Sequence, residues 1–306
     1  MRLDFLGINQ LLSDKLQSGD PFSCLRIDNT AGYVIDCIFK NIPISPAFYT
    51  SSTLIEGGVY PTNMEYGINV VQKETFKIME KADILGFVDM SGEIKNGPLS
   101  HFFENKDMFF YPDFYVMDPG PLLGCATKNF GLPKPQIPWT HYLKNKKVLV
   151  ISTHVESIKQ QWKQIDKVWG DKKDLIVPYE LVDVIRSPYH PTMDDRQPEN
   201  CETWLDSVEH IKKIIDGYDY DVLLAGCTTS APFYVQHAKE RGKVGIQTGG
   251  AIQLHFGVYG YRWTKVPGHS EWHNIFNEHW IYPLKIDEAN NRLLYPNLEV
   301  NFAYWG

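Results

Sequence analysis

Three short stretches of small and hydroxyl-bearing residues stand directly before expected helices, and they are the first candidates for chemistry. They are Ser152-Thr153-His154, Gly226-Cys227-Thr228-Thr229 and Thr248-Gly249-Gly250. Backbone N–H groups at a helix start, aided by the helix dipole, can hold a phosphate or a carboxylate. The sequence therefore predicts an anion-binding cleft built from these turns.

A thiol at one of these turns and an acidic pair that precedes an expected strand have competing interpretations. Cys227 precedes a helix, where its thiol pKa would fall and suit a nucleophile, but no His or Asp partner is close in sequence. The alternative for Cys227 is a small residue packed under a ligand loop. Asp219 and Asp221 have the spacing of a diphosphate–metal chelator, yet they precede a strand, at the wrong end of a parallel sheet.

The histidine-rich segment 269–280 offers a possible metal site and a possible base. His269 and His273 have the i, i+4 spacing of helical zinc sites, without the glutamate of H-E-x-x-H. A polar–aromatic rim around a sugar and ordinary loop packing are the alternatives. Glu278 is the most plausible general base in this stretch, because an attacking hydroxyl must lose its proton.

The common nucleotide and hydrolase signatures are absent from the sequence. There is no Walker A motif, no G-x-G-x-x-G and no G-x-S-x-G; GVYGYRW (257–263) has only two glycines. A P-loop nucleotidase, a dinucleotide-binding domain and an α/β-type serine hydrolase are therefore not supported.

Residues 147–263 alternate between buried-type strands and amphipathic helices. We expect strands at 147–152, 175–184, 221–227 and 243–250, and helices at 155–170, 202–217, 230–242 and 251–257. Such alternation predicts an α/β fold with a doubly wound, mostly parallel, Rossmann-like sheet. Ligands of such sheets bind beyond the carboxyl ends of the strands, which is where the three turns fall.

Residues 1–146 are less regular. We expect helices at 3–16 and 65–81, strands at 22–27 and 83–88, a turn into a helix over 28–41, and mostly loop over 97–138. We divide the chain into an N-terminal α/β half (1–146) and a Rossmann-like C-terminal half with an aromatic-rich tail (147–306), packed as one unit.

Composition limits the class of protein. The chain has 306 residues, 43% hydrophobic and 22% charged, with a net charge of −7 and no Lys/Arg cluster, which argues against nucleic-acid binding and against wholesale disorder. No apolar run is long enough to span a membrane, and the first residues do not have the pattern of a signal peptide. Five scattered cysteines indicate reduced thiols, so we expect a cytoplasmic protein.

Several stretches together resemble a glycosyltransferase family of polysaccharide gene clusters, related to the GT-D fold (DUF1792-like) enzymes. The most specific is GKVGIQTGGAIQLHFGVYGYRW (242–263), in which a strand, a diglycine, a helix and a closing Arg-Trp follow in order. The other similar stretches cover nearly the whole chain and are GGVYP (57–61), KADILGF (81–87), PWTHYLKNKKVLVIS (138–152), SIKQQW (157–162), DYDVLLAGC (219–227), NEHWIYP (277–283) and AYW (303–305).

The resemblance implies sugar transfer from a nucleoside-diphosphate sugar, with Mn²⁺ or Mg²⁺ on the donor diphosphate. In GT-D enzymes the first strand ends in a pattern like R-[FI]-G-x-x-E. Here Arg26 matches the arginine, Asp28 stands at the glycine position, and Ala31 replaces the glutamate. Three alternatives follow: Asp28 takes over metal coordination, the enzyme works without metal using Arg26 and helix N-termini, or catalysis has been lost.

We therefore expect a nucleotide-sugar-dependent glycosyltransferase that acts on a glycan or polysaccharide acceptor. Expected catalytic residues are Glu278, His154 and Asp28, the last also as a metal ligand. Expected donor-binding residues are Arg26, Asn29, Thr30, Thr153, Gly226, Cys227, Thr228, Gly249, Gly250, Gln253 and Arg262. The alternatives are another polysaccharide-tailoring transferase, such as an S-adenosylmethionine methyltransferase, and a non-catalytic nucleotide- or glycan-binding protein.

Overall fold

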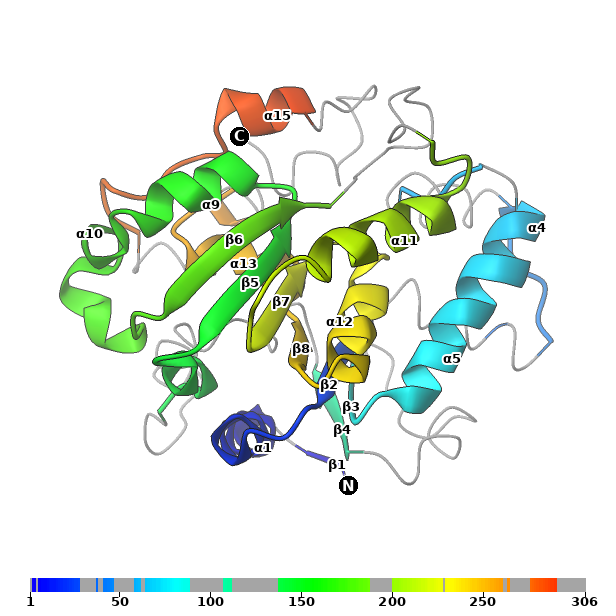
Figure 1. Ribbon diagram of the computed structural model, residues 1–306, viewed down its shortest axis with the longest axis horizontal. Coiled ribbons are helices and arrows are strands. Elements are labelled where there is room, and N and C mark those ends of the chain that lie inside the picture. Colours follow the sequence, from blue (N-terminus) through cyan, green and yellow to red (C-terminus); the bar gives the residue numbers. More distant parts are fainter. Residues whose placement is uncertain are drawn as a thin grey trace.

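The fold is a single parallel sheet with helices on both faces (Figure 1). The computed structural model describes residues 2–3, 5–27, 37, 41–46, 58–61, 64–88, 107–111, 137–187, 200–227, 229–260, 263–264 and 276–290. Within this part the sheet has eight strands in the order β1-β4-β3-β2-β8-β7-β5-β6, and every described strand pair is parallel. The prediction of an α/β fold with a parallel, doubly wound sheet is confirmed.

The strands come from both halves of the chain. In chain order they are β1 (Arg2–Leu3), β2 (Ser23–Ile27), β3 (Ile84–Val88), β4 (Asp107–Tyr111), β5 (Lys147–Ser152), β6 (Glu180–Arg186), β7 (Val222–Gly226) and β8 (Val244–Gln247). The register of β2 on β8 pairs Ser23 with Gly245 and Cys24 with Ile246. This pairing joins β1–β4 to β5–β8, so the sheet is continuous across the two halves.

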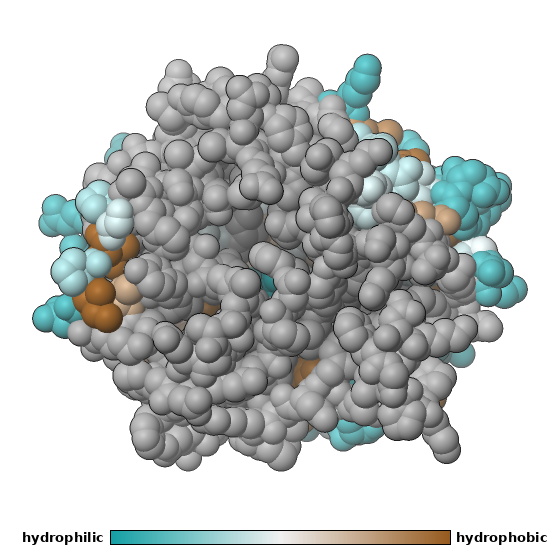
Figure 2. Space-filling model, turned by 180° about the vertical axis from the view of Figure 1, so that it is seen from behind, coloured by the Kyte–Doolittle hydropathy of each residue, from teal (hydrophilic) through white to brown (hydrophobic). Residues whose placement is uncertain are grey.

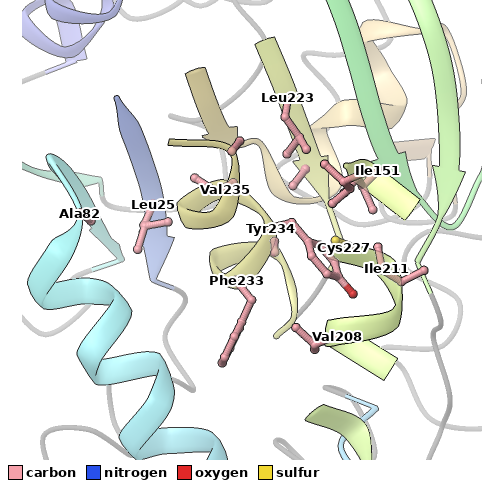
Figure 3. Close-up of a cluster of buried hydrophobic side chains, with 14 of the residues drawn as sticks. Leu25, Ala82, Ile151, Val208, Ile211, Leu223, Cys227, Phe233, Tyr234 and Val235 are labelled. Carbon is pink, nitrogen blue, oxygen red and sulfur yellow. The ribbon is translucent and has the colours of Figure 1, made fainter. Parts of the chain in front are cut away.

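The helices that pack on one face of the sheet bury the larger hydrophobic cluster. They are α5 (Lys73–Lys81), α11 (Trp204–Ile215) and α12 (Ala231–Glu240). Their apolar residues recur at helical spacing and meet the alternate side chains of the strands. Figure 3 shows members of this cluster, with Leu25 of β2 near Ala82 and Val235, and Val208 and Ile211 of α11 near Tyr234.

The opposite face is covered by helices from widely separated parts of the chain. They are α1 (Phe5–Ser18), a 3₁₀ turn (Trp139–Leu143), α9 (Val155–Trp162) and α13 (Ile252–His255), the last preceded by a 3₁₀ turn (Gly249–Ala251). A third cluster, which includes Trp169, Trp263 and Trp280, lies around α10 (Ile165–Trp169). Seen from behind the view of Figure 1, the described residues that reach the surface include both hydrophilic and hydrophobic side chains (Figure 2).

Most of the expected elements are present, with shifted ends. The helix expected at 65–81 comprises α4 (Met64–Tyr66), a π-helical segment (Gly67–Gln72) and α5. The helix expected at 155–170 divides into α9 and α10 at Lys163–Gln164, and a 3₁₀ segment (Gly170–Leu175) follows. The strand expected at 175–184 begins only at Glu180, after Pro178, because proline has no N–H for the ladder.

The expectations for the N-terminal half missed one strand, and one expected helix lies mainly outside the described residues. The segment 97–138 was expected to be mostly loop, yet it contains β4, whose Asp107–Tyr111 run pairs with β3 along its whole length. Tertiary pairing on both sides makes this aromatic run a strand despite the prolines and glycines around it. The expected helix over 28–41 falls mainly outside the described part of the chain.

No helix formed by the described residues is long and apolar enough to cross a membrane. The last described element is α15 (Lys285–Asn290), which packs on α9 at the top of Figure 1.

Candidate functional site

The strand order places a topological switch point between β7 and β5, at the carboxyl edge of the sheet. The connection after β5 leads outward to β6, whereas the connection after β7 leads inward to β8. In such sheets ligands bind where neighbouring connections diverge, beyond the carboxyl ends of the strands. The turns after β5, β7 and β8, which the sequence singled out, therefore share this edge with the end of β2.

Arg26 lies at the centre of this edge, next to the turn that follows β8. Its backbone N–H donates to the side-chain oxygen of Gln247 at 3.0 Å, and its side chain is 8% exposed. Gly249 has φ +60°, and a Cβ placed on it would lie 2.2 Å from Nη1 of Arg26. The guanidinium therefore lies directly against the glycine backbone, and only glycine leaves room for it.

Gly226 allows the end of β7 to approach the same turn. A Cβ on this glycine would lie 2.3 Å from Cγ2 of Ile252 and 2.7 Å from the carbonyl oxygen of Gly249. Thr248 closes the turn, with its N–H and hydroxyl both donating to the carbonyl of Ala225. The two glycines thus serve close packing, which holds Arg26 at the strand ends.

His154 follows β5 and has both ring nitrogens in hydrogen bonds. Nε2 lies 3.1 Å from the Nε2 amide nitrogen of Gln253, and Nδ1 lies 3.1 Å from the hydroxyl of Thr153. An amide nitrogen only donates, so the imidazole Nε2 accepts and carries no proton. With the Gln253 amide nitrogen as donor, Nε2 is the accepting nitrogen of the ring and Nδ1 faces the Thr153 hydroxyl.

The start of α9 holds a carboxylate from the protein itself. The sequence led us to expect a ligand at this helix N-terminus, but Asp287 of α15 accepts from the backbone N–H of Ser157 at 2.8 Å and from that of Glu156 at 3.2 Å. Arg186, at the end of β6, pairs with the same carboxylate at 3.0 Å. A ligand anion at this edge would therefore sit nearer to the turns after β7 and β8.

Cys227 belongs to the hydrophobic cluster under the site. Figure 3 shows it beside Tyr234 and Ile211. Burial raises the pKa of this thiol to about 12, opposed by hydrogen bonds with Ser230 and Ser187. A thiol with such a pKa holds almost no thiolate at neutral pH, so the structure favours the packing role over the nucleophile.

Glu278 is not brought to this edge. Its neighbours bind the far end of α9 and α10: Gln161 donates to the carbonyl of His279 at 2.8 Å, and Asn277 donates to the carbonyl of Val168 at 3.0 Å. Since α9 starts at the carboxyl edge and its last turn lies at the other end, Glu278 is separated from His154 by the length of that helix. Of the two alternative candidates for the base, this geometry brings His154, and not Glu278, to the carboxyl edge.

The acidic pair that precedes β7 is structural. Asp221 accepts the backbone N–H of Lys147 at 2.8 Å, and Asp219 pairs with the ammonium of the same lysine at 2.6 Å. Both contacts join the amino ends of β5 and β7, away from the carboxyl edge of the sheet, as the sequence indicated.

Several expected site residues lie outside the described part of the chain. They are Asp28, Asn29, Thr30, Thr228 and Arg262, together with Ala31 and the pair His269 and His273. Among the described residues, no group of three or more His, Cys, Asp or Glu side chains could hold a metal ion. The described binding candidates that do meet at the carboxyl edge are Arg26, Thr153, His154, Gly226, Cys227, Gly249, Gly250 and Gln253.

Sequence reasoning missed Gln247, Arg186 and Asp287. Gln247 and Arg186 are the last residues of β8 and β6. The rule that ligands bind beyond the carboxyl ends of the strands therefore pointed to their positions. Asp287 had no such signal, because its partners on α9 are about 130 residues away in the chain.

Comparison with solved structures gives two neighbours of low identity. One is a glycosyltransferase (DUF1792) from Streptococcus sanguinis, with 12% identity, a TM-score of 0.45, and coverage of 92% of this chain and 97% of that one. The other is a selenomethionine-substituted domain of unknown function 1792 (DUF1792), with 12% identity, a TM-score of 0.44, and coverage of 92% and 94%. No family model matches the chain, and no curated protein matches its sequence.

Proposed function

We propose that this protein is a glycosyltransferase that moves a sugar from a nucleoside diphosphate to a hydroxyl of a glycan or polysaccharide acceptor. The observation that carries the proposal is the buried guanidinium of Arg26 against the Gly249 turn, at the carboxyl edge of the sheet, which is the edge where doubly wound sheets bind ligands. The resemblance of GKVGIQTGGAIQLHFGVYGYRW (242–263) and its companion stretches to polysaccharide-cluster glycosyltransferases agrees with it.

The charge of the leaving group explains why such a guanidinium is useful. As the bond between the anomeric carbon and the diphosphate oxygen breaks, the electron pair leaves with the diphosphate and negative charge grows on it. A fixed guanidinium in a poorly solvated edge stabilises that charge without reorganising. The backbone of Gly249 and Gly250 lies in the turn beside Arg26, and in this proposal its N–H groups supply further donors.

His154 is our proposed base. The acceptor hydroxyl attacks the anomeric carbon, and its proton passes to a neighbouring base as the new C–O bond forms. In this proposal His154 acts as the neutral imidazole, with Nε2, which faces the amide nitrogen of Gln253, as the accepting nitrogen, and it lies at the same edge as Arg26. In this proposal the incoming hydroxyl takes the place of the Gln253 amide at Nε2. Glu278 is too distant to share this role.

A divalent ion on the donor diphosphate remains part of the proposal through Asp28, which directly follows β2. The proposed setting is cytoplasmic, where nucleotide sugars are available. The divalent ion and the compartment each need a separate experiment, because neither follows from the position of Arg26.

The test is donor turnover by the full chain. Purified protein is incubated with UDP-, GDP-, CDP- and dTDP-sugars, with and without Mn²⁺, and release of nucleoside diphosphate is measured, with S-adenosylmethionine binding tested in parallel. We expect release from donors of one base, lost in Arg26→Met. The matched control, Arg241→Met, removes an arginine paired with Asp216 at the opposite edge and should keep the activity. Binding of S-adenosylmethionine with no release from any donor would overturn the proposal.

A further inference from the structure

A carboxylate near the C-terminal end of the described chain is fully buried against the start of α9. Asp287 is 0% exposed. One oxygen accepts from the hydroxyl and the backbone N–H of Ser157, at 2.7 and 2.8 Å, and the other accepts from the backbone N–H of Glu156 at 3.2 Å. These are free N–H groups of the first helical turn, so Asp287 caps α9 from a distant segment.

Arg186 extends this contact to the turn before the helix. Its Nη2 lies 3.0 Å from the carboxylate of Asp287, while its Nη1 donates to the carbonyl of Thr153 at 3.0 Å. One guanidinium therefore joins the buried carboxylate to the backbone of the Thr153–His154 turn. Because the guanidinium is planar and rigid, its two bonds to different acceptors fix direction as well as distance.

The segment that carries Asp287 is attached along the whole of α9. At one end Gln161 donates to the carbonyl of His279, and at the other the backbone N–H of Leu284 donates to the hydroxyl of Ser157. Ser157 thus accepts from Leu284 and donates to Asp287. The carboxylate consequently has little freedom to leave the helix start.

We infer that Asp287 is a positioning residue for His154, acting through Arg186 and the first turn of α9. This inference rests on the proposed function, in which His154 Nε2 receives the proton of the acceptor. The bonds of Asp287 and Arg186 reach the backbone on both sides of His154, at Thr153 and Glu156. They set the direction in which the imidazole leaves the turn and hence its contact with Gln253.

The experiment compares Asp287→Asn with Asp183→Asn. Asp183 also links β6 to α9, through Lys159 at 2.7 Å, and it accepts from Tyr218, but neither bond involves the His154 turn. For Asp287→Asn we expect kcat to fall by about 10- to 100-fold with KM within about threefold, because a misplaced group costs rate more than binding. Asp183→Asn should keep both parameters within about twofold.

A second readout does not depend on activity. The ¹⁵N signals of the His154 ring, assigned with His154→Asn, report which nitrogen carries the proton. We expect the Nδ1–H form in the wild type and in Asp183→Asn, and mixed or Nε2–H signals in Asp287→Asn. If Asp287→Asn does not fold, Arg186→Lys, which keeps the charge but loses the fork, replaces it, with the same changes expected.

The two hypotheses fail in different ways. If the wild type turns over no donor, the proposed function fails and the ring signals alone decide the positioning role. Unchanged His154 signals in a folded Asp287 or Arg186 variant, or a kcat within twofold of the wild type, would overturn the inference.

Discussion

Replacing Gly249 with alanine tests whether the position of Arg26 matters for ligand binding. Gly249 has φ +60°, and the added Cβ would lie 2.2 Å from Nη1 of Arg26. Since Nη1 is the far end of a flexible side chain, we expect the guanidinium to move aside and the fold to remain. A side chain in this left-handed region costs about 1–2 kcal/mol of folding free energy.

Gly242 provides the matched control. It has φ +74°, and nothing lies within 4 Å of a Cβ placed on it. Gly242→Ala should therefore lose a similar folding free energy, about 1–2 kcal/mol, with no effect at the strand ends. Urea denaturation of both variants measures this backbone cost separately from any effect on binding.

The two variants should differ in affinity for the nucleoside diphosphate that the wild type releases from its donor. A charge-assisted hydrogen bond contributes about 1.5–3 kcal/mol, so Gly249→Ala should raise Kd roughly 10- to 150-fold. Gly242→Ala should leave Kd unchanged. Calorimetric titration gives both values. A folded Gly249→Ala protein with the Kd of the wild type would refute the assignment of Arg26 to the diphosphate.

Three further predictions concern the scaffold. Gly245→Ala should cost about 3 kcal/mol in urea denaturation, because its Cβ would lie 2.3 Å from the backbone carbonyl of Val235 in α12; a loss below 1 kcal/mol would contradict this close packing. Cys227, whose pKa burial raises to about 12, should resist a thiol reagent at pH 8 in the native protein and react in guanidinium, and rapid native labelling would contradict its burial. Thr203→Ala should cost about 1 kcal/mol, because Thr203 and Asp206 form the capping box of α11. Hydrogen bonds from Thr203 lower the pKa of Asp206 below 3.8 in the folded protein. The carboxylate therefore stabilises the fold fully above pH 3.8, and this stabilisation is lost as the pH falls through the lower folded pKa. A loss of folding free energy in Asp206→Asn that stayed constant below pH 3.8 would contradict this.

The C-terminal half was largely predictable because its strands are continuous apolar runs. Such runs, at 147–152 and 221–227, need burial on both faces, which leaves a parallel sheet covered by helices as the solution. The turns that follow these strands could then be assigned to one edge, because the carboxyl ends of parallel strands lie together. β4 was missed because its aromatic run lies among prolines and glycines, and only its partners β1 and β3 make it a strand.

Which residues meet at the site could not be predicted from local sequence patterns, because it depends on contacts between distant parts of the chain. Arg26 comes from the less regular half, and its contact with Gly249 depends on the pairing of β2 with β8, which no local pattern specifies. The contact of Asp287 with α9 joins positions about 130 residues apart. Glu278 was favoured because of its chemistry, yet the same segment that brings Asp287 to the start of α9 holds Glu278 at the other end.

We propose that a nucleoside diphosphate binds at the carboxyl edge, between Arg26 and the turn after β8. Hydrogen–deuterium exchange of the full chain is compared with and without the nucleoside diphosphate that is released from the donor. We predict slower exchange in peptides that contain Arg26 and residues 247–253, and no change at Glu156 and Ser157, whose N–H groups Asp287 already holds. Protection confined to the first turn of α9, or to the amino edge around Lys147 and Asp219, would contradict the account.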